Sequence, residues 1–97
     1  MFCSLHNHTE FSNGRFLDAT VKVKDLIHHA IELGYCGIAC TDHECLSAAV
    51  ELSQIEDKIK IEHPDFKIIR GNEIYLIDET AVGNTNKFYH FLLLAKD

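Results

Sequence analysis

Short apolar runs alternate with stretches of helical periodicity along this chain, and this alternation restricts the possible folds more than any other feature. Apolar runs typical of strands cover residues 2–8, 35–41, 66–77 and 88–95. Helical periodicity separates the first run from the second, and the second run from the third. Strands that alternate with helices predict an α/β fold with largely parallel pairing, in which ligands collect at the carboxyl ends of the strands.

Two helices are expected from the apolar periodicity. The first begins near Val23 and ends at Gly34, because glycine adopts the left-handed conformation that closes many helices. Its apolar face comprises Val23, Leu26, Ile27, Ala30 and Ile31. The second begins at about Leu46, and its expected apolar face comprises Leu46, Ala49, Val50 and Leu52. The polar segment 56–65 contains the only proline, Pro64, and is interpreted as a connection that carries a frayed helix end.

The last two strands are expected to pair differently from the first ones. Gly71 is expected to interrupt the third strand, since glycine inside a strand often marks a bulge. The loop 78–86 is too short to hold a crossover helix, so the third and fourth strands should form an antiparallel hairpin.

Six side chains that can bind metal ions lie on the expected strands or in the loops after them: His6 and His8 at the C-terminal end of the first strand, Asp18 in the following loop, His43 just after the second strand, Glu73 on the third and His90 on the fourth. In a strand His6 and His8 would project from the same side, because side chains alternate across it. Imidazole and carboxylate groups are ligands that Zn, Mn and Fe accept. These six residues could therefore converge into one metal centre at the carboxyl ends of the strands.

Each part of this pattern also has a simpler explanation. The chain has seven histidines in 97 residues, so chance alone would produce about half an H-x-H triplet. Glu73 could be an exposed glutamate beside a bulge at Gly71, and His90 could be a hydrogen-bonded core histidine. The remaining histidines are assigned to positions outside the site: His28, His29 and His63.

The net charge and the lengths of the apolar runs argue against two classes of protein, nucleic-acid binders and membrane proteins. The formal net charge of -6 argues against a free-standing nucleic-acid binder, which needs clustered Lys and Arg. No apolar run reaches the roughly 18 residues that span a bilayer, so no membrane contact is expected.

The four cysteines lack C-x-x-C spacing and no secretory signal is recognised, which favours a reduced, cytoplasmic setting. Cys36 and Cys40 are expected to pack as small apolar residues, and Cys3 and Cys45 to be structural.

Three motifs occur in the order found in the polymerase and histidinol phosphatase (PHP) family: His6-Asn7-His8, Thr41-Asp42-His43 and Gly71-Asn72-Glu73. Together with the segments 5–12, 30–34 and 90–96, they make the chain resemble the N-terminal PHP domain of bacterial or phage DNA polymerase III alpha subunits. The resemblance implies a distorted β/α barrel, of which residues 1–97 would be the N-terminal portion of a longer chain.

The resemblance also implies roles for single residues. It implies His6, His8, Asp18, His43, Glu73 and His90 as metal ligands, with Glu73 bridging two ions. His8, His43 and Glu73 would be the catalytic residues among them. Asp42 would lie behind the ligands and hold them in place. The gap from His8 to Asp18 is longer than in the usual polymerase pattern, which leaves Glu10 as a competitor of Asp18. Further family ligands come from later strands.

The implied activity is metal-dependent phosphoester hydrolysis with two or three ions of Zn, Mn or Fe. In a replicative DNA polymerase this would be a 3′–5′ exonuclease that proofreads, with DNA reached through the full-length protein and other replisome subunits as possible partners. Two alternatives remain open. One is a free-standing phosphatase of a small phosphate monoester such as histidinol phosphate, and the other is a catalytically silent structural platform within a polymerase.

Overall fold

The computed structural model describes residues 1–14, 17–78 and 88–96, and this part of the chain has an α/β fold. The elements follow in the order β1 (Cys3–Ser4), the 3-10 helix η1 (Glu10–Ser12), α1 (Val23–Glu32), β2 (Gly37–Cys40), α2 (Ala48–Glu62), β3 (Lys67–Ile77) and β4 (Phe88–Leu94). The strands form one sheet in the order β1-β2-β3-β4. β1, β2 and β3 pair in parallel, while β3 and β4 form the expected antiparallel pair.

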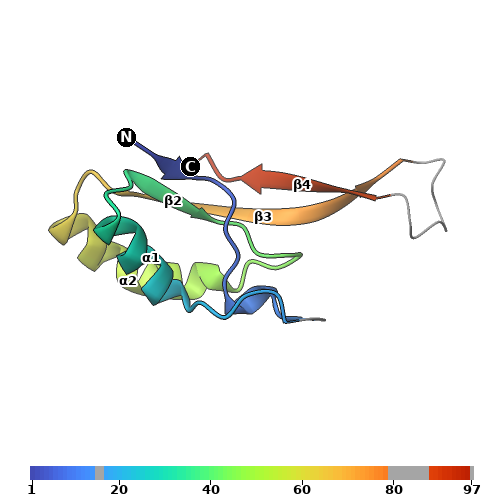
Figure 1. The fold of residues 1–97 in the computed structure, drawn as a ribbon, viewed down its shortest axis with the longest axis horizontal. Coiled ribbons are helices and arrows are strands. Elements are labelled where there is room, and N and C mark those ends of the chain that lie inside the picture. The colour runs from blue at the N-terminus through green and yellow to red at the C-terminus, as the bar shows by residue number, and fades with distance from the viewer. Residues whose placement is uncertain (15–16, 79–87, 97) are drawn as a thin grey trace.

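Both helices lie on the same side of this sheet (Figure 1). α1 buries Val23, Ile27 and Ala30 completely or nearly so, with Leu26 and Ile31 packed against them, as the periodicity predicted. Gly34 has a φ of 78° and its amide donates to the carbonyl of Ile31, which confirms that glycine closes this helix. The core between helices and sheet also contains Ile38, Cys40, Leu52, Ile59 and Phe66.

The second helix is longer than expected, and its predicted apolar face was largely wrong. α2 continues to Glu62, so most of the segment interpreted as a connection is helical. Its buried residues are Ala48, Leu52 and Ile59, whereas Leu46 and Val50 are exposed. The polar residues of segment 56–62 form a solvated helix face, on which Lys60 Nζ lies 3.1 Å from Glu56 Oε1 one turn away. The polarity of segment 56–62 therefore reflects the exposure of one helix face, and it does not mark the end of the helix.

The first strand is shorter than expected. The prediction of a strand over residues 2–8 was wrong beyond Ser4, because the backbone then leaves the ladder of β2. Asn7 causes this departure: its side-chain amide donates to the carbonyls of Ser4 and Ala39, at 3.2 and 2.9 Å. Its backbone exchanges hydrogen bonds with Thr41, so the segment that carries His6 and His8 is held against the end of β2.

Gly71 does not interrupt β3 but marks where the strand changes neighbours. Residues Lys67 to Arg70 pair with β2, and Gly71 to Ile77 pair with β4. A Cβ atom at Gly71 would lie 2.7 Å from the carbonyl oxygen of Leu93 and 2.9 Å from Thr41 Cγ2. Glycine is therefore needed for close approach of the neighbouring strands. The expected loop 78–86 lies, apart from Asp78, outside the described residues.

Within the described ranges, no helix has the length and apolar character that crossing a bilayer requires.

Candidate metal centre

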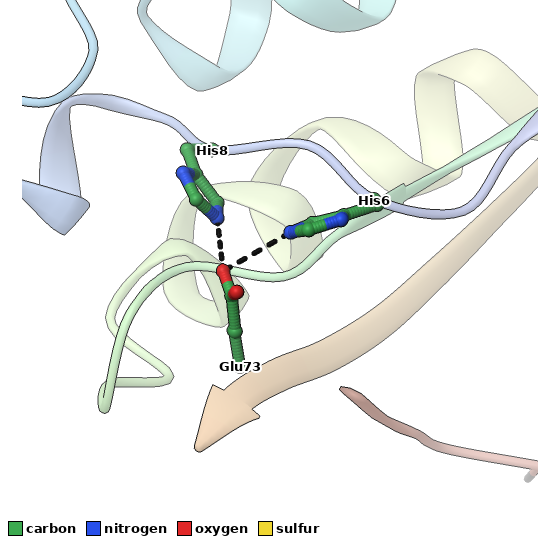
Figure 2. Close-up of side chains that lie close together, drawn as sticks. All are labelled: His6, His8 and Glu73. Atoms are coloured by element: carbon green, nitrogen blue, oxygen red, sulfur yellow. Dashed lines mark hydrogen bonds and ion pairs between the residues drawn. The ribbon is translucent and has the colours of Figure 1, made fainter. Parts of the chain in front are cut away.

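The centre of the site is Glu73, which is buried on β3 with only 2% of its side chain exposed. Its Oε2 atom lies 3.0 Å from His6 Nε2 and 2.5 Å from His8 Nε2, and its Oε1 atom lies 2.6 Å from His90 Nδ1. Figure 2 shows His6 and His8 pointing to the same carboxylate oxygen from the segment that follows β1. The prediction that the two histidines face the same side is thus confirmed, although they do not lie in a strand.

The backbone places His43 directly beside Glu73. The two residues form an isolated parallel bridge, with Glu73 N donating to the carbonyl of Asp42 and Glu44 N donating to the carbonyl of Glu73. His43 Nδ1 is 3.5 Å from Glu73 Oε2, but the geometry is not that of a hydrogen bond. Among the described residues, this buried nitrogen has no hydrogen-bond partner. Its lone pair is therefore available to a metal ion.

Asp18 reaches the site from the loop after η1. Its Oδ2 atom is 2.6 Å from His8 Nδ1 and 3.7 Å from His43 Nε2. Asn13 fixes this loop, because its side-chain oxygen accepts from the amides of Asp18 and Ala19, at 2.6 and 2.9 Å. Glu10, the predicted competitor, belongs to none of the possible metal-binding groups found in the described residues. The geometry therefore favours Asp18 over Glu10.

The six predicted ligands form three overlapping groups, within each of which the ligand atoms lie less than 4.8 Å apart. The groups are His6, His8 and Glu73; His8, Asp18 and His43; and His43, Glu73 and His90. His8, His43 and Glu73 each belong to two groups. Of these three side chains, the Glu73 carboxylate, with its two oxygens, is the one able to bridge neighbouring ions, since a neutral imidazole offers a single lone pair.

The surroundings of His8 also fit a bound cation. Both of its ring nitrogens face carboxylates, with Nε2 beside Glu73 and Nδ1 beside Asp18. A neutral imidazole carries one N–H, so it can donate a hydrogen bond to only one of these two acceptors. A cation bound by the other nitrogen and carboxylate would satisfy both, and the donor set of imidazoles and carboxylates suits Zn, Mn or Fe.

Glu73 is ionised over the whole physiological pH range. Burial raises the pKa of its carboxyl, but hydrogen bonds from His90, His6 and His8 and the charge of His43 outweigh burial and lower it to about 2. The site is open on one side, since the side chains of His6 and His90 are about half exposed, at 52% and 53%. A charged carboxylate thus lies beneath imidazoles that solvent can reach.

Asp42 lies behind these residues, as the resemblance implied. Its carboxylate is buried and accepts hydrogen bonds from Thr9 N at 2.5 Å, Thr9 Oγ1 at 2.8 Å and Ser12 Oγ at 2.8 Å. Ser12 Oγ in turn accepts from His43 N at 3.0 Å. Sequence reasoning missed Thr9, Ser12 and Asn13 as organising residues. The signal was present for the first two, which follow His8 within the segment 5–12 that carries the family resemblance.

The simpler explanations of single residues were wrong. Glu73 is buried and not an exposed residue beside a bulge, and His90 is exposed and not a core histidine. The histidines predicted to lie elsewhere do so: His28 and His29 are on α1, and His63 ends α2. Cys40 packs in the core, also as predicted.

A cavity of about 710 Å³ opens beside the cluster. Its walls include two of the candidate ligands, Asp18 and His43, so the cavity and the cluster are continuous. The other lining residues are Phe11, Ser12, Gly14, Glu44, Cys45, Tyr75, Ile77 and Phe88.

Comparison with known proteins agrees with this arrangement. The family model described as the PHP domain matches residues 4–97. The chain is 46% identical over 101 aligned residues to "Probable DNA polymerase YorL" of Bacillus subtilis, covering 95% of this chain and 8% of that protein. It is 32% identical over 106 aligned residues to DNA polymerase III subunit alpha of Aquifex aeolicus, covering 99% and 8%. The chain therefore spans about a twelfth of these relatives' length.

The fold has a counterpart among solved structures. A crystal structure of a "putative metal-dependent phosphoesterase" from Bifidobacterium adolescentis superposes with a TM-score of 0.68 at 27% identity. The match covers 93% of this chain and 26% of the other, consistent with part of a β/α barrel. By its motifs, its family match and its fold, the chain belongs to the PHP domain family, in the branch that resembles bacterial and phage DNA polymerases.

Proposed function

We propose that this chain contributes the first ligands of a divalent-metal phosphoesterase centre. The ligands would be His6, His8, Asp18, His43, Glu73 and His90, holding two or three ions of Zn, Mn or Fe. The observation that carries the proposal is the position of His8, whose two ring nitrogens face the carboxylates of Glu73 and Asp18 at 2.5 and 2.6 Å. A neutral imidazole has one N–H, so a hydrogen bond from it satisfies only one of these two contacts.

Each residue has a distinct part in the proposed centre. Glu73 supplies permanent negative charge at the base of the cluster, and the parallel bridge to His43 fixes its distance from the neighbouring imidazole. His8 and His43 connect the Asp18 side of the cluster with the Glu73 side. Bound divalent ions would polarise a phosphate ester and lower the pKa of a bound water. The half-exposed His6 and His90 leave the substrate side of the cluster open.

The proposed substrate is the 3′ end of DNA, hydrolysed as a 3′–5′ exonuclease within a polymerase. The support is that the relatives with the highest similarity reported above are DNA polymerases. The negative charge of this chain means that most of the phosphate backbone would be held elsewhere in the full-length protein. A reaction confined to one terminal phosphate needs little contact from this domain itself.

The test compares two substrates on the full-length protein with added Mn²⁺: single-stranded DNA carrying a 3′ label, and histidinol phosphate. We expect release of labelled mononucleotide, and a loss of roughly 100-fold or more in His8→Ala, since even partners of metal ligands contribute 10- to 100-fold. His29→Ala is the matched control, because the side chain of His29 is exposed on α1, where it lies 3.7 Å from Glu32. Hydrolysis of histidinol phosphate alone would identify a phosphatase instead. No hydrolysis of either substrate would leave a structural platform.

A further inference from the structure

The cavity beside the metal-ligand cluster has an aromatic wall that the proposed metal chemistry does not use. The antiparallel register of β3 and β4 pairs Glu73 with Leu92, Tyr75 with His90, and Ile77 with Phe88. Since side chains alternate along a strand, these six residues share one face of the hairpin. That face carries the candidate ligands Glu73 and His90 toward one end, and the apolar side chains of Ile77 and Phe88 toward the other.

Tyr75 joins the two parts of this face. Its ring lies nearly parallel to that of His43 at a centroid distance of 6.1 Å, and meets the edge of His90 at 5.2 Å. It also contacts Phe88 edge to face, with ring centroids 4.7 Å apart. Tyr75 and Phe88 remain partly exposed, at 38% and 43%, and both line the cavity. Aromatic surface is therefore open to a ligand directly beside the cluster.

The polar groups of the cavity restrict what that ligand can be. Among the described residues, its lining contains Asp18 and Glu44 but neither lysine nor arginine. An anionic group would find no cationic side chain among these residues, and the metal ions of the proposed cluster would be the groups that attract it. The aromatic wall suits a neutral, flat ring, because such rings stack on aromatic side chains. The volume of about 710 Å³ falls in the usual range of small-molecule pockets.

We propose that this cavity binds the base of the nucleotide whose phosphate ester lies at the metal cluster, with Phe88 and Tyr75 as the stacking surface. The inference rests on the proposed function, because the phosphate is held only if the cluster binds metal. It adds a binding site for the base to that function. The cavity then distinguishes nucleotides from phosphate esters that lack an aromatic ring.

Phe88 is the better residue for a test, because Tyr75 contacts two candidate ligands, His43 and His90, at ring-centroid distances of 6.1 and 5.2 Å, whereas the ring of Phe88 lies 6.0 Å from that of His90. Phe88→Leu keeps an apolar residue but removes the ring. Tyr89→Leu is the matched control: it removes a neighbouring ring on the opposite face of β4, where Tyr89 is 69% exposed. The probes are deoxyadenosine 5′-monophosphate and 2-deoxyribose 5-phosphate, which share the phosphate and sugar but differ in the base.

Calorimetric titration of the metal-loaded full-length protein should show that deoxyadenosine monophosphate binds ~10-fold more tightly than deoxyribose phosphate, as one base–aromatic stack contributes. Phe88→Leu should lower this ratio toward one, and Tyr89→Leu should leave it in place. Equal affinities in the metal-loaded, unaltered protein would overturn the base site while leaving the metal centre intact. Metal content of the same samples reports on the centre separately.

A further outcome would also overturn the inference. If Phe88→Leu lowers the melting temperature of the full-length protein but keeps the affinity ratio, the aromatic wall is covered by another part of that protein. The tyrosine control separates this result from a general effect of removing a ring from β4.

Discussion

His43 and Glu73 lie opposite each other in a parallel bridge, held by backbone hydrogen bonds on both sides of the pair. These two candidate metal ligands are 30 positions apart in the sequence. Their relative position is fixed by backbone pairing that extends the sheet, and not by contacts between their side chains. Glu44, directly after His43, has a φ of 53°, a left-handed conformation that non-glycine residues rarely adopt. The chain therefore turns sharply once His43 is in place, which leaves the imidazole at the edge of the cavity.

The choice between Asp18 and Glu10 gives the first prediction. Asp18→Asn should lower the metal content of the full-length protein, because the carboxylate lies 2.6 Å from His8 Nδ1. Glu10→Gln should leave the metal content unchanged, since Glu10 contributes to none of the three groups. Elemental analysis of both purified variants checks this. The reverse pattern would show that Glu10 is the ligand.

Asp42→Asn should destabilise the protein by about 1.5–3 kcal/mol, since buried hydrogen bonds to a charged group contribute about this much. The substituted amide can accept through only one of its two polar atoms, whereas Asp42 accepts from Thr9 and Ser12 with both oxygens. Metal content should also fall, because Thr9 adjoins His8. Denaturant unfolding measures the change, with Asp57→Asn on the exposed face of α2 as the control. Equal stability of the two variants would show that these bonds contribute nothing.

Gly71→Ala should destabilise the protein by about 1–3 kcal/mol, the usual cost of overpacking. The new Cβ would lie 2.7 Å from a backbone oxygen and 2.9 Å from Thr41 Cγ2, so β4 or the end of β2 must move. Gly14→Ala is a matched control, because no heavy atom of the described residues other than its chain neighbours lies within 4 Å of its Cβ position. Thermal unfolding of both variants tests the prediction, which fails if their melting temperatures are the same.

Arg70 should stabilise the protein in a pH-dependent way through Glu56. Hydrogen bonds from Arg70, at 2.7 Å, and from Lys60 lower the pKa of Glu56 below its ordinary value of 4.5. The unfolded chain then binds more protons, so this contribution is present above pH 4.5 and is lost as the pH falls through the folded-state pKa. Arg70→Met should therefore lower the free energy of unfolding by about 0.5–1 kcal/mol at pH 7, and by almost nothing at the lowest pH of the series.

The control for this prediction is Lys24→Met, which removes an exposed positive charge on α1 away from Glu56. Urea unfolding of the three proteins between pH 7 and pH 3 gives the differences in stability. A cost of Arg70→Met that does not change with pH would show that the Glu56 pair is not its source.

The parts of the fold that sequence predicted well are those whose pattern is local. The face of α1 and the glycine after it were predicted because a period of 3.6 and a left-handed turn depend on neighbouring residues only. The end of α2 was missed because segment 56–62 is mostly polar, and its one buried residue, Ile59, is too little to show the period. The end of β1 was missed because it depends on Asn7 bonding to Ala39, 32 positions away.

The same distinction applies to the site. All six candidate ligands could be named from the family resemblance, although Asp18 departs from its usual spacing. The contacts between these residues could not be predicted. Glu73 is buried because both β4 and the segment after β1 pack over it, and these two parts are far apart in the sequence. Asn13 could not be recognised as a supporting residue either, because amide side chains are equally common in ordinary loops, whereas Thr9 and Ser12 lie within the family-like segment 5–12 and were missed there.

The most direct test of the proposed metal centre is the metal content of the full-length protein, measured by mass spectrometry for each element in unaltered protein and in Glu73→Gln. We expect two or three ions of Zn, Mn or Fe per chain in the unaltered protein. We expect at least one ion fewer in Glu73→Gln, which keeps the shape of the side chain but removes the charge that four imidazoles surround. Absence of these metals from the unaltered protein, or equal metal content in both proteins, would contradict the proposed metal centre.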